Sequence, residues 1–217
     1  MYLNLNASGV NTDTHAGSSL GDTIHASVES IYGSNFGNVI RNNAVARSIV
    51  GADGTDLLTA GSAGDVLSAG AGNDILTGGA GNDNFNGGLG NDTYNVVRGG
   101  GADTIIDTDV TSGNRDVLKF TAGVTNDQLW FKQVGNSLEV DIIGTADKVT
   151  IADWYSGAGN QVEVIQAGGL EVDNTSIINL VTAMAAMAPP AMGTLTLSAG
   201  QATQLAPVLA ANWHAAA

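Results

Sequence analysis

A large apolar residue recurs at every ninth position through the middle of the chain. The recurring residues are Leu58, Leu67, Leu76, Phe85 and Tyr94. Each stands at the centre of a short stretch such as Leu57-Leu58-Thr59, which favours a three-residue strand whose central side chain points inward. One such strand cannot bury its apolar residue alone. The period therefore predicts stacked units that contact their neighbours.

A column of aspartates precedes these apolar residues by two positions: Asp56, Asp65, Asp74, Asp83 and Asp92. The units read GADGTDLLT from Gly51, AGSAGDVLS from Ala60, AGAGNDILT from Ala69, GGAGNDNFN from Gly78 and GGLGNDTYN from Gly87. The pattern is the nonapeptide G-G-x-G-x-D-x-U-x, where U is a large apolar residue. A disordered glycine-rich linker would explain the composition but not a fixed phase with apolar residues in register.

The repeat resembles the parallel β-roll of the repeats-in-toxin (RTX) family, which binds calcium. The resemblance implies that two nonapeptides make one turn, so that Asp56 stacks on Asp74 and Asp65 stacks on Asp83. Carboxylates at the strand spacing of about 4.8 Å repel by about 1 kcal/mol in water, and by more where water is excluded. Several calcium ions are the expected neutralising cations, because calcium accepts oxygen ligands in flexible geometry and magnesium does not.

The predicted calcium ligands are six carboxylates and the main-chain carbonyl groups around the loop glycines. The carboxylates are Asp56, Asp65, Asp74, Asp83, Asp92 and Asp103. The glycines are Gly51, Gly54, Gly70, Gly72, Gly79, Gly81, Gly88 and Gly90. Alanine replaces a consensus glycine at Ala52, Ala60, Ala63 and Ala69. The turn around Ala63 is therefore the weakest of the predicted sites.

The apolar column extends further along the chain than the carboxylate column. The insertion Val96-Val97 breaks the register before a sixth unit, RGGGADTII from Arg98, which carries Asp103 and Ile105. On the other side the paired positions are Asn38/Ile40, Arg47/Ile49 and Glu29/Ile31. Residues 24–50 are therefore predicted to form calcium-poor turns of the same solenoid.

From about Arg115 onward, apolar and polar residues alternate, which predicts half-buried strands. The alternating sets are Val117/Leu118/Phe120, Leu129/Phe131, Leu138/Val140/Ile142, Val149/Ile151 and Val162/Val164. Residues 134–137 suit a hairpin turn. Trp130, Trp154 and Tyr155 are assigned to the core, with an aromatic ligand platform as the alternative.

The stretches NRDVLKF and VTNDQLWFKQVGNSLEVDIIGTADKVTIADWY resemble the haemolysin-type calcium-binding-related domain, over about residues 114–213. That domain often follows RTX repeats in large secreted bacterial proteins. A helix is predicted over residues 174–188, capped by Asn174 or Ser176 and ended by Pro189-Pro190. A second helix is predicted over residues 201–213, with Pro207 as a candidate break.

The predicted fold class is all-β: a parallel β-roll or β-solenoid, a mainly antiparallel β cap and a short helical C-terminal tail. The predicted division is 1–23 as an N-terminal cap or the edge of a longer protein, 24–50 as calcium-poor turns, 51–109 as the calcium-binding roll, 110–173 as the β cap and 174–217 as the helical tail. The strands of the cap suit the open end of a solenoid, because solenoid ends need covering.

Composition narrows the choice of partners. The net charge is −14, and residues 51–109 carry nine aspartates and one arginine, so nucleic acid is not an expected partner. No cysteine is present, which leaves metal binding as the stabilising cross-link. No stretch is long and apolar enough for a transmembrane segment, and the N-terminus does not read as a signal peptide. The RTX resemblance implies type I secretion from a Gram-negative bacterium, with a signal in the tail.

An enzyme is not expected. Gly17-Ser18-Ser19-Leu20-Gly21 matches G-x-S-x-G, with His15, Asp22 and His25 nearby, but its flanks lack the strand and helix of a nucleophile elbow. No H-E-x-x-H zinc motif occurs. Two alternatives remain beside the secreted calcium-binding module. One is the C-terminal export module of a larger toxin, lipase or protease. The other is an adhesion module that binds extracellular polysaccharide or a protein.

Overall fold

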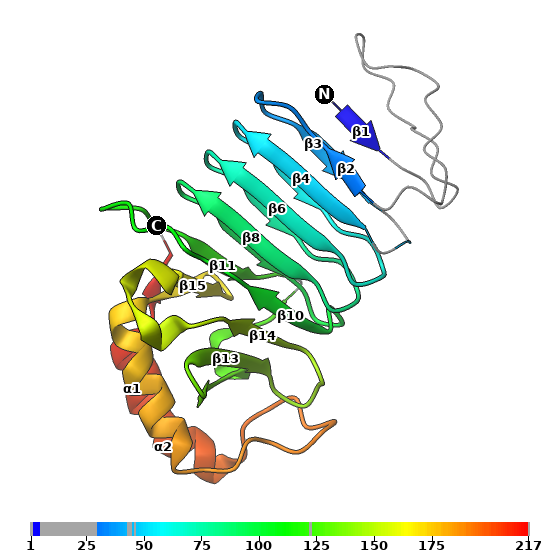
Figure 1. Ribbon diagram of the computed structural model, residues 1–217. Helices are drawn as coiled ribbons and strands as arrows, with labels where there is room; N and C mark the ends of the chain where they lie inside the picture. The colour runs from blue at the N-terminus through cyan, green and yellow to red at the C-terminus, as the bar shows by residue number, and fades with distance from the viewer. Residues whose placement is uncertain (1, 5–29, 43–44, 46, 122, 217) are drawn as a thin grey trace.

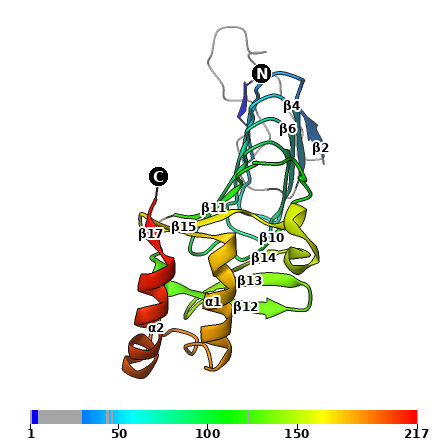
Figure 2. The ribbon, with the colours of Figure 1, turned by 90° about the vertical axis from the view of Figure 1, so that its left-hand side faces the viewer.

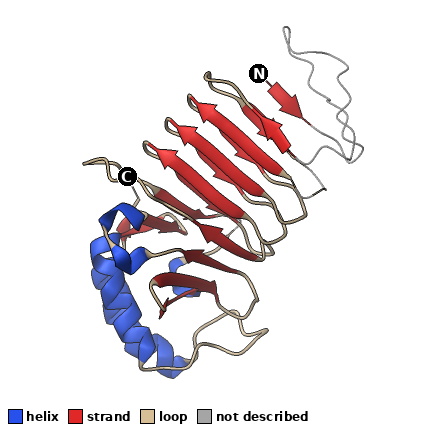
Figure 3. Cartoon of the chain, viewed as in Figure 1, coloured by secondary structure: helices blue, strands red, loops and turns tan. Residues whose placement is uncertain are grey.

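The computed structural model describes residues 2–4, 30–42, 45, 47–121 and 123–216. This part of the chain is mostly β-strand in two sheets, with two α-helices near its C-terminal end (Figures 1 and 3). The all-β prediction is confirmed at this level. The G-x-S-x-G motif at residues 17–21, with His15, Asp22, His25 and Glu29, lies outside the described residues.

Strands of the repeat region belong alternately to the two sheets. The first sheet contains β1 (Tyr2–Asn4), β3 (Val39–Arg41), β5 (Leu57–Thr59), β7 (Ile75–Thr77) and β9 (Thr93–Val96), in that spatial order. The second contains β2 (Ser30–Tyr32), β4 (Ser48–Asp53), β6 (Val66–Ala71), β8 (Asn84–Leu89) and β10 (Ala102–Ile105). The chain thus crosses from one sheet to the other after each strand of the repeat region. Within each sheet the strands lie parallel, one above the next (Figure 1).

The parallel pairing has the predicted register of two nonapeptides. Leu58 pairs with Leu76, and Leu76 pairs with Tyr94. In the other sheet Ile49 pairs with Leu67, and Leu67 pairs with Phe85. The same register continues to Ile31 in β2 and Ile40 in β3, so the tiers extend before the first aspartate, as the apolar column predicts.

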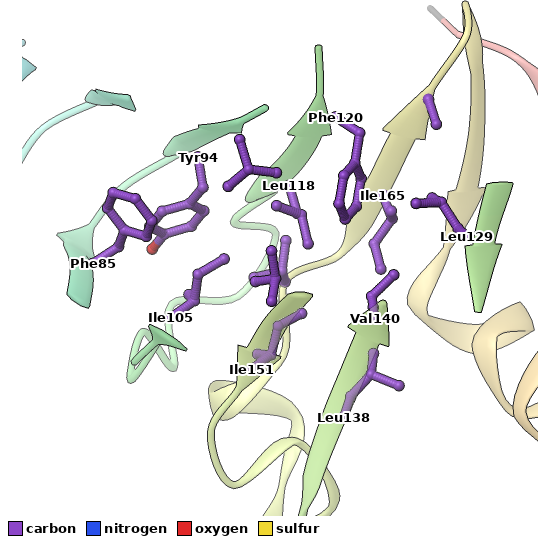
Figure 4. Close-up of a cluster of buried hydrophobic side chains, with 14 of the residues drawn as sticks. Phe85, Tyr94, Ile105, Leu118, Phe120, Leu129, Leu138, Val140, Ile151 and Ile165 are labelled. Atoms are coloured by element: carbon purple, nitrogen blue, oxygen red, sulfur yellow. The ribbon is translucent and has the colours of Figure 1, made fainter. Parts of the chain in front are cut away.

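The core lies between the two sheets. Along each short strand the central side chain points inward: Leu76 is 0% exposed, whereas its neighbour Ile75 is 41% exposed. The rings of Phe85 and Tyr94 come from opposite sheets and meet with their centroids 6.2 Å apart. Figure 4 shows this column continuing from Phe85 and Tyr94 through Ile105 to the side chains of the C-terminal half.

Both sheets continue into the C-terminal half without a break. The first sheet adds β11 (Val117–Phe120), β15 (Val164–Ala167), β16 (Leu170–Asp173) and β17 (His214–Ala215). The second adds β14 (Lys148–Ile151), β13 (Ser137–Ile142) and β12 (Leu129–Val134). The pairs β10–β14 and β11–β15 are still parallel, and the remaining strands pair antiparallel.

The predicted strands of this half and the hairpin at residues 134–137 are confirmed, with two corrections. Val162 is buried in a loop, and β15 begins only at Val164. Strand β16 was not predicted from the alternation. It follows a tight turn at Gly168 and Gly169, whose φ angles of +61° and +81° suit glycine. Trp130 and Trp154 are core residues and present no ring surface to a ligand.

Two helices pack at the C-terminal end, away from the repeat tiers (Figure 2). Helix α1 (Asn174–Ala185) buries Ile177, Leu180, Val181 and Met184, and packs against β12. It ends earlier than the predicted residue 188, and the residue at its N-cap is Asp173 rather than Asn174 or Ser176.

Helix α2 (Ala199–Asn212) begins before the predicted residue 201 and runs through Pro207 without a break. Ser198 explains the earlier start. Its hydroxyl accepts the Gln201 amide at 3.3 Å while the Gln201 side chain accepts the Ser198 amide at 2.9 Å, which forms a capping box. Short 3₁₀ turns at Asn126–Gln128, Trp154–Ser156 and Ala158–Asn160 complete the described elements.

Candidate metal centre

The glycine-rich turns lie along two edges between the sheets. We call first edge the turns Gly33–Asn38, Gly51–Asp56, Ala69–Asp74 and Gly87–Asp92, which lead from the second sheet to the first. The second edge holds the turns Ala60–Asp65, Gly78–Asp83 and Arg98–Asp103, which lead back. Each turn except Gly33–Asn38 ends in one of the six predicted carboxylate ligands. All six aspartates are buried, with Asp103 the most exposed at 3%.

Each aspartate is held by the turn before it in the stack. The Asp56 amide donates to Asp74 Oδ1 at 2.7 Å, and the Asp74 amide donates to Asp92 Oδ1 at 2.9 Å. On the second edge the Asp65 amide donates to Asp83 Oδ1 at 2.7 Å, and the Asp83 amide donates to Asp103 Oδ1 at 2.9 Å. These ladders leave one oxygen, Oδ2, of each carboxylate for another partner.

The hydrogen bonding of Oδ2 differs between the two edges. On the second edge, the Gly61 amide donates to Asp65 Oδ2 at 2.9 Å and the Gly79 amide donates to Asp83 Oδ2 at 3.1 Å. On the first edge, Oδ2 of Asp56 and Oδ2 of Asp74 are buried and have no hydrogen-bond partner. A buried carboxylate oxygen without a donor is costly, so a positive group at these two oxygens would stabilise the first edge.

Main-chain carbonyl groups of the first edge point toward glycines of the adjacent turn. A Cβ atom placed on Gly72 would overlap the Gly54 carbonyl oxygen, and one placed on Gly90 would overlap the Gly72 carbonyl oxygen. Only glycine permits this approach, and both residues have positive φ, +145° and +118°. Gly54, Gly70 and Gly88 also have positive φ. Gly51 instead packs its Cα against the carboxylate of Asp56.

Glycine positions of the second edge have a different backbone. Gly81 has a φ of +110°, but Gly79 does not have a positive φ and gives its amide to Asp83. Ala63 occupies the position equivalent to Gly81 without adopting a positive φ. Ala52, on the first edge, does adopt one, at +88°, because it stacks in register with Gly70. The turn at Ala63 therefore departs from the repeat conformation, whereas the turn at Ala52 keeps it.

Asn38 stands in the aspartate column of the first edge, one turn before Asp56, and its side-chain amide contacts several oxygen atoms. Its side-chain nitrogen Nδ2 donates to Ser34 O at 2.8 Å, Asp56 Oδ1 at 3.0 Å, Gly51 O at 3.4 Å and Phe36 O. One amide nitrogen thus stands among three carbonyl oxygens and a carboxylate. The residues eighteen positions further on are Ala52, Gly54, Ala69 and Asp74, and there the column residue is Asp56, which brings no N–H donor.

The corresponding position of the second edge also carries nitrogen groups. Arg47 is buried, and its Nε donates to Asn42 Oδ1 at 3.2 Å. Asn42 Nδ2 in turn donates to Asp65 Oδ1 at 2.8 Å. The turns that contain Asn38 and Arg47 therefore supply their own N–H donors to the carboxylates of Asp56 and Asp65.

The atoms of the first edge that remain available as metal ligands are all oxygen atoms. Within the described ranges, no three His, Cys, Asp or Glu side chains are grouped as a ready metal site. Any cation on the first edge must therefore take main-chain carbonyl groups beside the stacked carboxylates. Such mixed oxygen sets of flexible geometry suit calcium, and the unpaired oxygens of Asp56 and Asp74 fit that ion.

Comparison with known proteins agrees with this chemistry. The family model described as "RTX calcium-binding nonapeptide repeat (4 copies)" matches residues 59–94. The chain carries RTX repeats. A second model, "Haemolysin-type calcium binding protein related domain", matches residues 138–174 in the C-terminal half. Repeats of this kind are characteristic of secreted bacterial proteins.

One relative of the RTX repeats is "Iron-regulated protein FrpA" from Neisseria meningitidis serogroup C. It is 34% identical over 85 residues, which cover 39% of this chain and 7% of that protein. The similarity therefore concerns a small part of a much longer relative. Across the described ranges of the present chain, neither helix has the length and apolarity needed to cross a membrane.

Burial raises the pKa of several carboxylates in the RTX repeats, so ionising them without a cation costs free energy. Burial raises the pKa of Asp74 to about 6, and the neighbouring Asp56 carboxylate adds to the rise. Burial and the charges of Asp116 and Asp74 raise the pKa of Asp92 to about 7. Burial and the charge of Asp83 raise the pKa of Asp103 to about 7. The ladder amides oppose each rise but do not cancel it.

The C-terminal half contributes one further carboxylate to each edge, and neither is among the predicted ligands. Asp116 is the next member of the first-edge ladder, because the Asp92 amide donates to its Oδ1 at 2.7 Å. Asp147 receives the amides of Gly99 at 2.7 Å and Gly101 at 3.1 Å at the last turn of the second edge. The spacing of Asp116 and Leu118 repeats the Asp-x-U signal, which could have identified Asp116. No repeat signal marks Asp147.

Proposed function

We propose that this chain is a calcium-binding RTX module of a secreted bacterial protein, whose repeats wind into a parallel β-roll on calcium. The observation that carries the proposal is the pair of buried, unpartnered Oδ2 atoms of Asp56 and Asp74. Calcium supplies the positive charge that these oxygens lack. The ligands on the first edge are the carboxylates of Asp56, Asp74 and Asp92, with the main-chain carbonyls that face them.

The carbonyl ligands follow from the position of the Asn38 amide. Carbonyl oxygens of Ala52, Gly54 and Ala69 occupy the equivalent positions one turn later. Cβ atoms on Gly70, Gly72 and Gly51 would overlap or crowd those three oxygens respectively, so the oxygens point toward the adjacent turn. The alanine carbonyls replace some of the glycine carbonyls that the sequence pattern proposes.

The second-edge carboxylates Asp65, Asp83 and Asp103 belong to the same proposal but to a weaker class of site. Their Oδ2 atoms must exchange an existing hydrogen bond for a metal bond at Asp65 and Asp83. We therefore expect the first edge to fill at lower calcium concentrations than the second.

Coupling of metal binding to folding gives the module its role. Without calcium, the buried carboxylate columns and the conformational entropy of the glycine-rich turns both oppose the folded state. Cytosolic calcium is too scarce to fill such sites, and extracellular modules bind calcium at roughly 10⁻⁴–10⁻³ M. The chain would then leave the cell unfolded by type I secretion, with its signal in residues 174–217, and fold outside.

The proposal includes the division of the chain after residues 23, 50, 109 and 173. It also includes a role as part of a larger secreted protein, without catalysis. The local match to a much longer relative supports the larger parent chain. No contact among the described residues favours a polysaccharide partner over calcium alone.

Calcium titration followed by far-UV circular dichroism tests the proposal, with magnesium and a chelator as controls. We expect a cooperative gain of β signal in calcium and none in magnesium. A spectrum that is fully folded in chelator and unchanged by calcium would reject calcium-coupled folding, and a scaffold or adhesion role would replace it.

A further inference from the structure

Two buried carboxylates lie in the loop that leads from the last repeat strand to the C-terminal half. Asp107 and Asp116 are 2% and 1% exposed, and both fall between the two regions matched by family models, residues 59–94 and 138–174. Asp107 belongs to no nonapeptide position. The loop joins β10 to β11, so it lies where the repeat tiers meet the C-terminal strands (Figure 1).

Hydrogen bonds fix Asp116 and its surroundings. Asp116 Oδ1 accepts the Asp92 amide at 2.7 Å, and Oδ2 accepts Asn114 Nδ2 at 2.9 Å. The Asp116 amide donates to Glu163 Oε2 at 2.9 Å. Asp109 Oδ2 accepts the Gly90 amide at 2.9 Å. The loop is therefore anchored to the first edge on one side and to the residues before β15 on the other.

Asp107 has no such support at one oxygen. Its Oδ1 accepts the Asp109 amide at 3.1 Å, whereas its Oδ2 is buried and has no hydrogen-bond partner. Burial and direct contact with the Asp116 carboxylate raise the pKa of Asp107 to about 8. Without a cation the pair must share a proton, because two adjacent buried carboxylates do not both ionise.

We propose that Asp107 and Asp116 form a calcium site at the junction of the repeats and the C-terminal half, with Asp107 Oδ2 as the ligand that no protein group satisfies. Two carboxylates are fewer than the six to eight oxygens that calcium takes, so main-chain carbonyl groups and water complete the set. A cavity of about 450 Å³ borders the same loop, and its lining includes the side chains of Asp109, Asn114 and Glu163.

The consequence is a cation that locks the C-terminal half onto the repeats. Asp116 immediately precedes β11, which pairs with both β9 and β15, so a bound ion would fix the order of these strands. The inference rests on the proposed calcium chemistry of the repeats, but the two are separable. The repeat sites can fill without the junction site, since Asp107 takes no part in the ladders.

The number of calcium ions per intact chain decides the matter. Equilibrium dialysis at saturating calcium would compare the wild type, Asp107→Asn and the control Asp153→Asn, which removes an equal charge at an exposed left-handed position that suits asparagine. We expect Asp107→Asn to bind one ion fewer and Asp153→Asn to bind the full number. Asparagine matches the shape of the protonated aspartate, so Asp107→Asn should keep the wild-type circular dichroism spectrum in calcium.

An unchanged ion count in a folded Asp107→Asn protein would overturn the junction site and leave the repeat sites standing. A wild type that binds no calcium would remove the proposed function itself. If Asp107→Asn fails to fold, a crystal of the calcium-loaded wild type decides through anomalous scattering. A calcium peak bonded to Asp107 Oδ2 supports the site, and occupied repeat sites without that peak overturn it.

Discussion

The main-chain amide of Asp56 donates a 2.7 Å hydrogen bond to Oδ1 of Asp74, eighteen residues later. This bond joins two adjacent turns and also orients the second carboxylate oxygen of Asp74, which then has no partner. In the function proposed above, this single bond prepares a site for a cation. The same relationship links Asn38 to Asp56, where the Asn38 amide group occupies the gap instead.

Asn38→Asp should create one further calcium site. The substitution removes the Nδ2 donor that now bonds carbonyl oxygens of Ser34 and Gly51, and leaves a carboxylate in the same column. Metal-free protein should lose about 1–3 kcal/mol of stability, because those acceptors lose their donor. Equilibrium dialysis should find one more bound ion per chain than in the wild type. A gain of none, with the protein folded in calcium, would contradict the assignment of Asn38 as a calcium substitute.

Asp74→Asn and Asp83→Asn should affect different phases of calcium binding. Asp74 lies on the first edge with a free Oδ2, whereas Asp83 Oδ2 already accepts the Gly79 amide. We expect Asp74→Asn to remove an ion from the tighter phase, and to weaken calcium-induced folding by about tenfold, the equivalent of one lost charge-assisted interaction. Asp83→Asn should reduce the weaker phase only. Isothermal titration calorimetry distinguishes the phases, and equal effects of the two variants would contradict the difference between the edges.

Metal-free protein should be more stable in mild acid than in alkali. Folding raises the pKa of Asp74 from 3.8 to about 6 and those of Asp92 and Asp103 to about 7. The folded state then binds more protons than the unfolded state between those values, so its stability falls as pH rises through the window. Far-UV circular dichroism at pH 5 and pH 8, after calcium removal on a chelating resin, measures this as the β signal that the protein retains.

A histidine acts in the same direction and needs its own control. Hydrogen bonds to the Ala215 carbonyl and to Asp173 raise the pKa of His214, which therefore also stabilises the folded state at lower pH. The variant His214→Gln should retain most of the pH dependence. A β signal of the calcium-free protein that is equal at the two pH values, or higher at pH 8, would show that burial does not hold protons on the carboxylate columns.

Ala52→Gly should stabilise the folded protein by about 1 kcal/mol, because Ala52 has a φ of +88° that only glycine adopts without strain. Ala63→Gly is the matched control. Ala63 also replaces a consensus glycine, at the fourth rather than the second position of its nonapeptide, but has no positive φ, so added glycine freedom should leave stability unchanged or reduce it by up to about 1 kcal/mol. Chemical unfolding in saturating calcium would compare them. Equal shifts would mean that the two turns share one backbone conformation in solution.

Leu76→Ala should cost about 3 kcal/mol of unfolding free energy, because Leu76 is fully buried between the sheets. Its neighbour Ile75 is 41% exposed, and Ile75→Ala should cost less than about 1 kcal/mol. Chemical unfolding in calcium again provides the measurement. Similar costs for both residues would indicate that the strand does not keep the alternation seen here.

The nine-residue period predicts the stacking, the buried columns and the calcium chemistry, because each of these depends only on spacing. Leu58 pairs with Leu76 since two units make one turn, and any sequence with this period must place its aspartates in similar columns. Alternation likewise predicts most strands of the C-terminal half. Helix ends and strand β16 depend on capping and glycine turns, and spacing does not determine them.

Only the tertiary structure distinguishes the edges and completes the sites. Asp74 and Asp83 occupy equivalent positions in the repeat, yet one oxygen of Asp83 accepts the Gly79 amide and the matching oxygen of Asp74 is free. The difference arises from backbone torsions, which decide whether an N–H or a C=O group faces the carboxylate. Asp107 and Asp116 lie in one loop, and they meet because the strands that flank this loop pair with other strands of both sheets. Those strand pairings join distant parts of the chain, so the spacing of residues does not encode them.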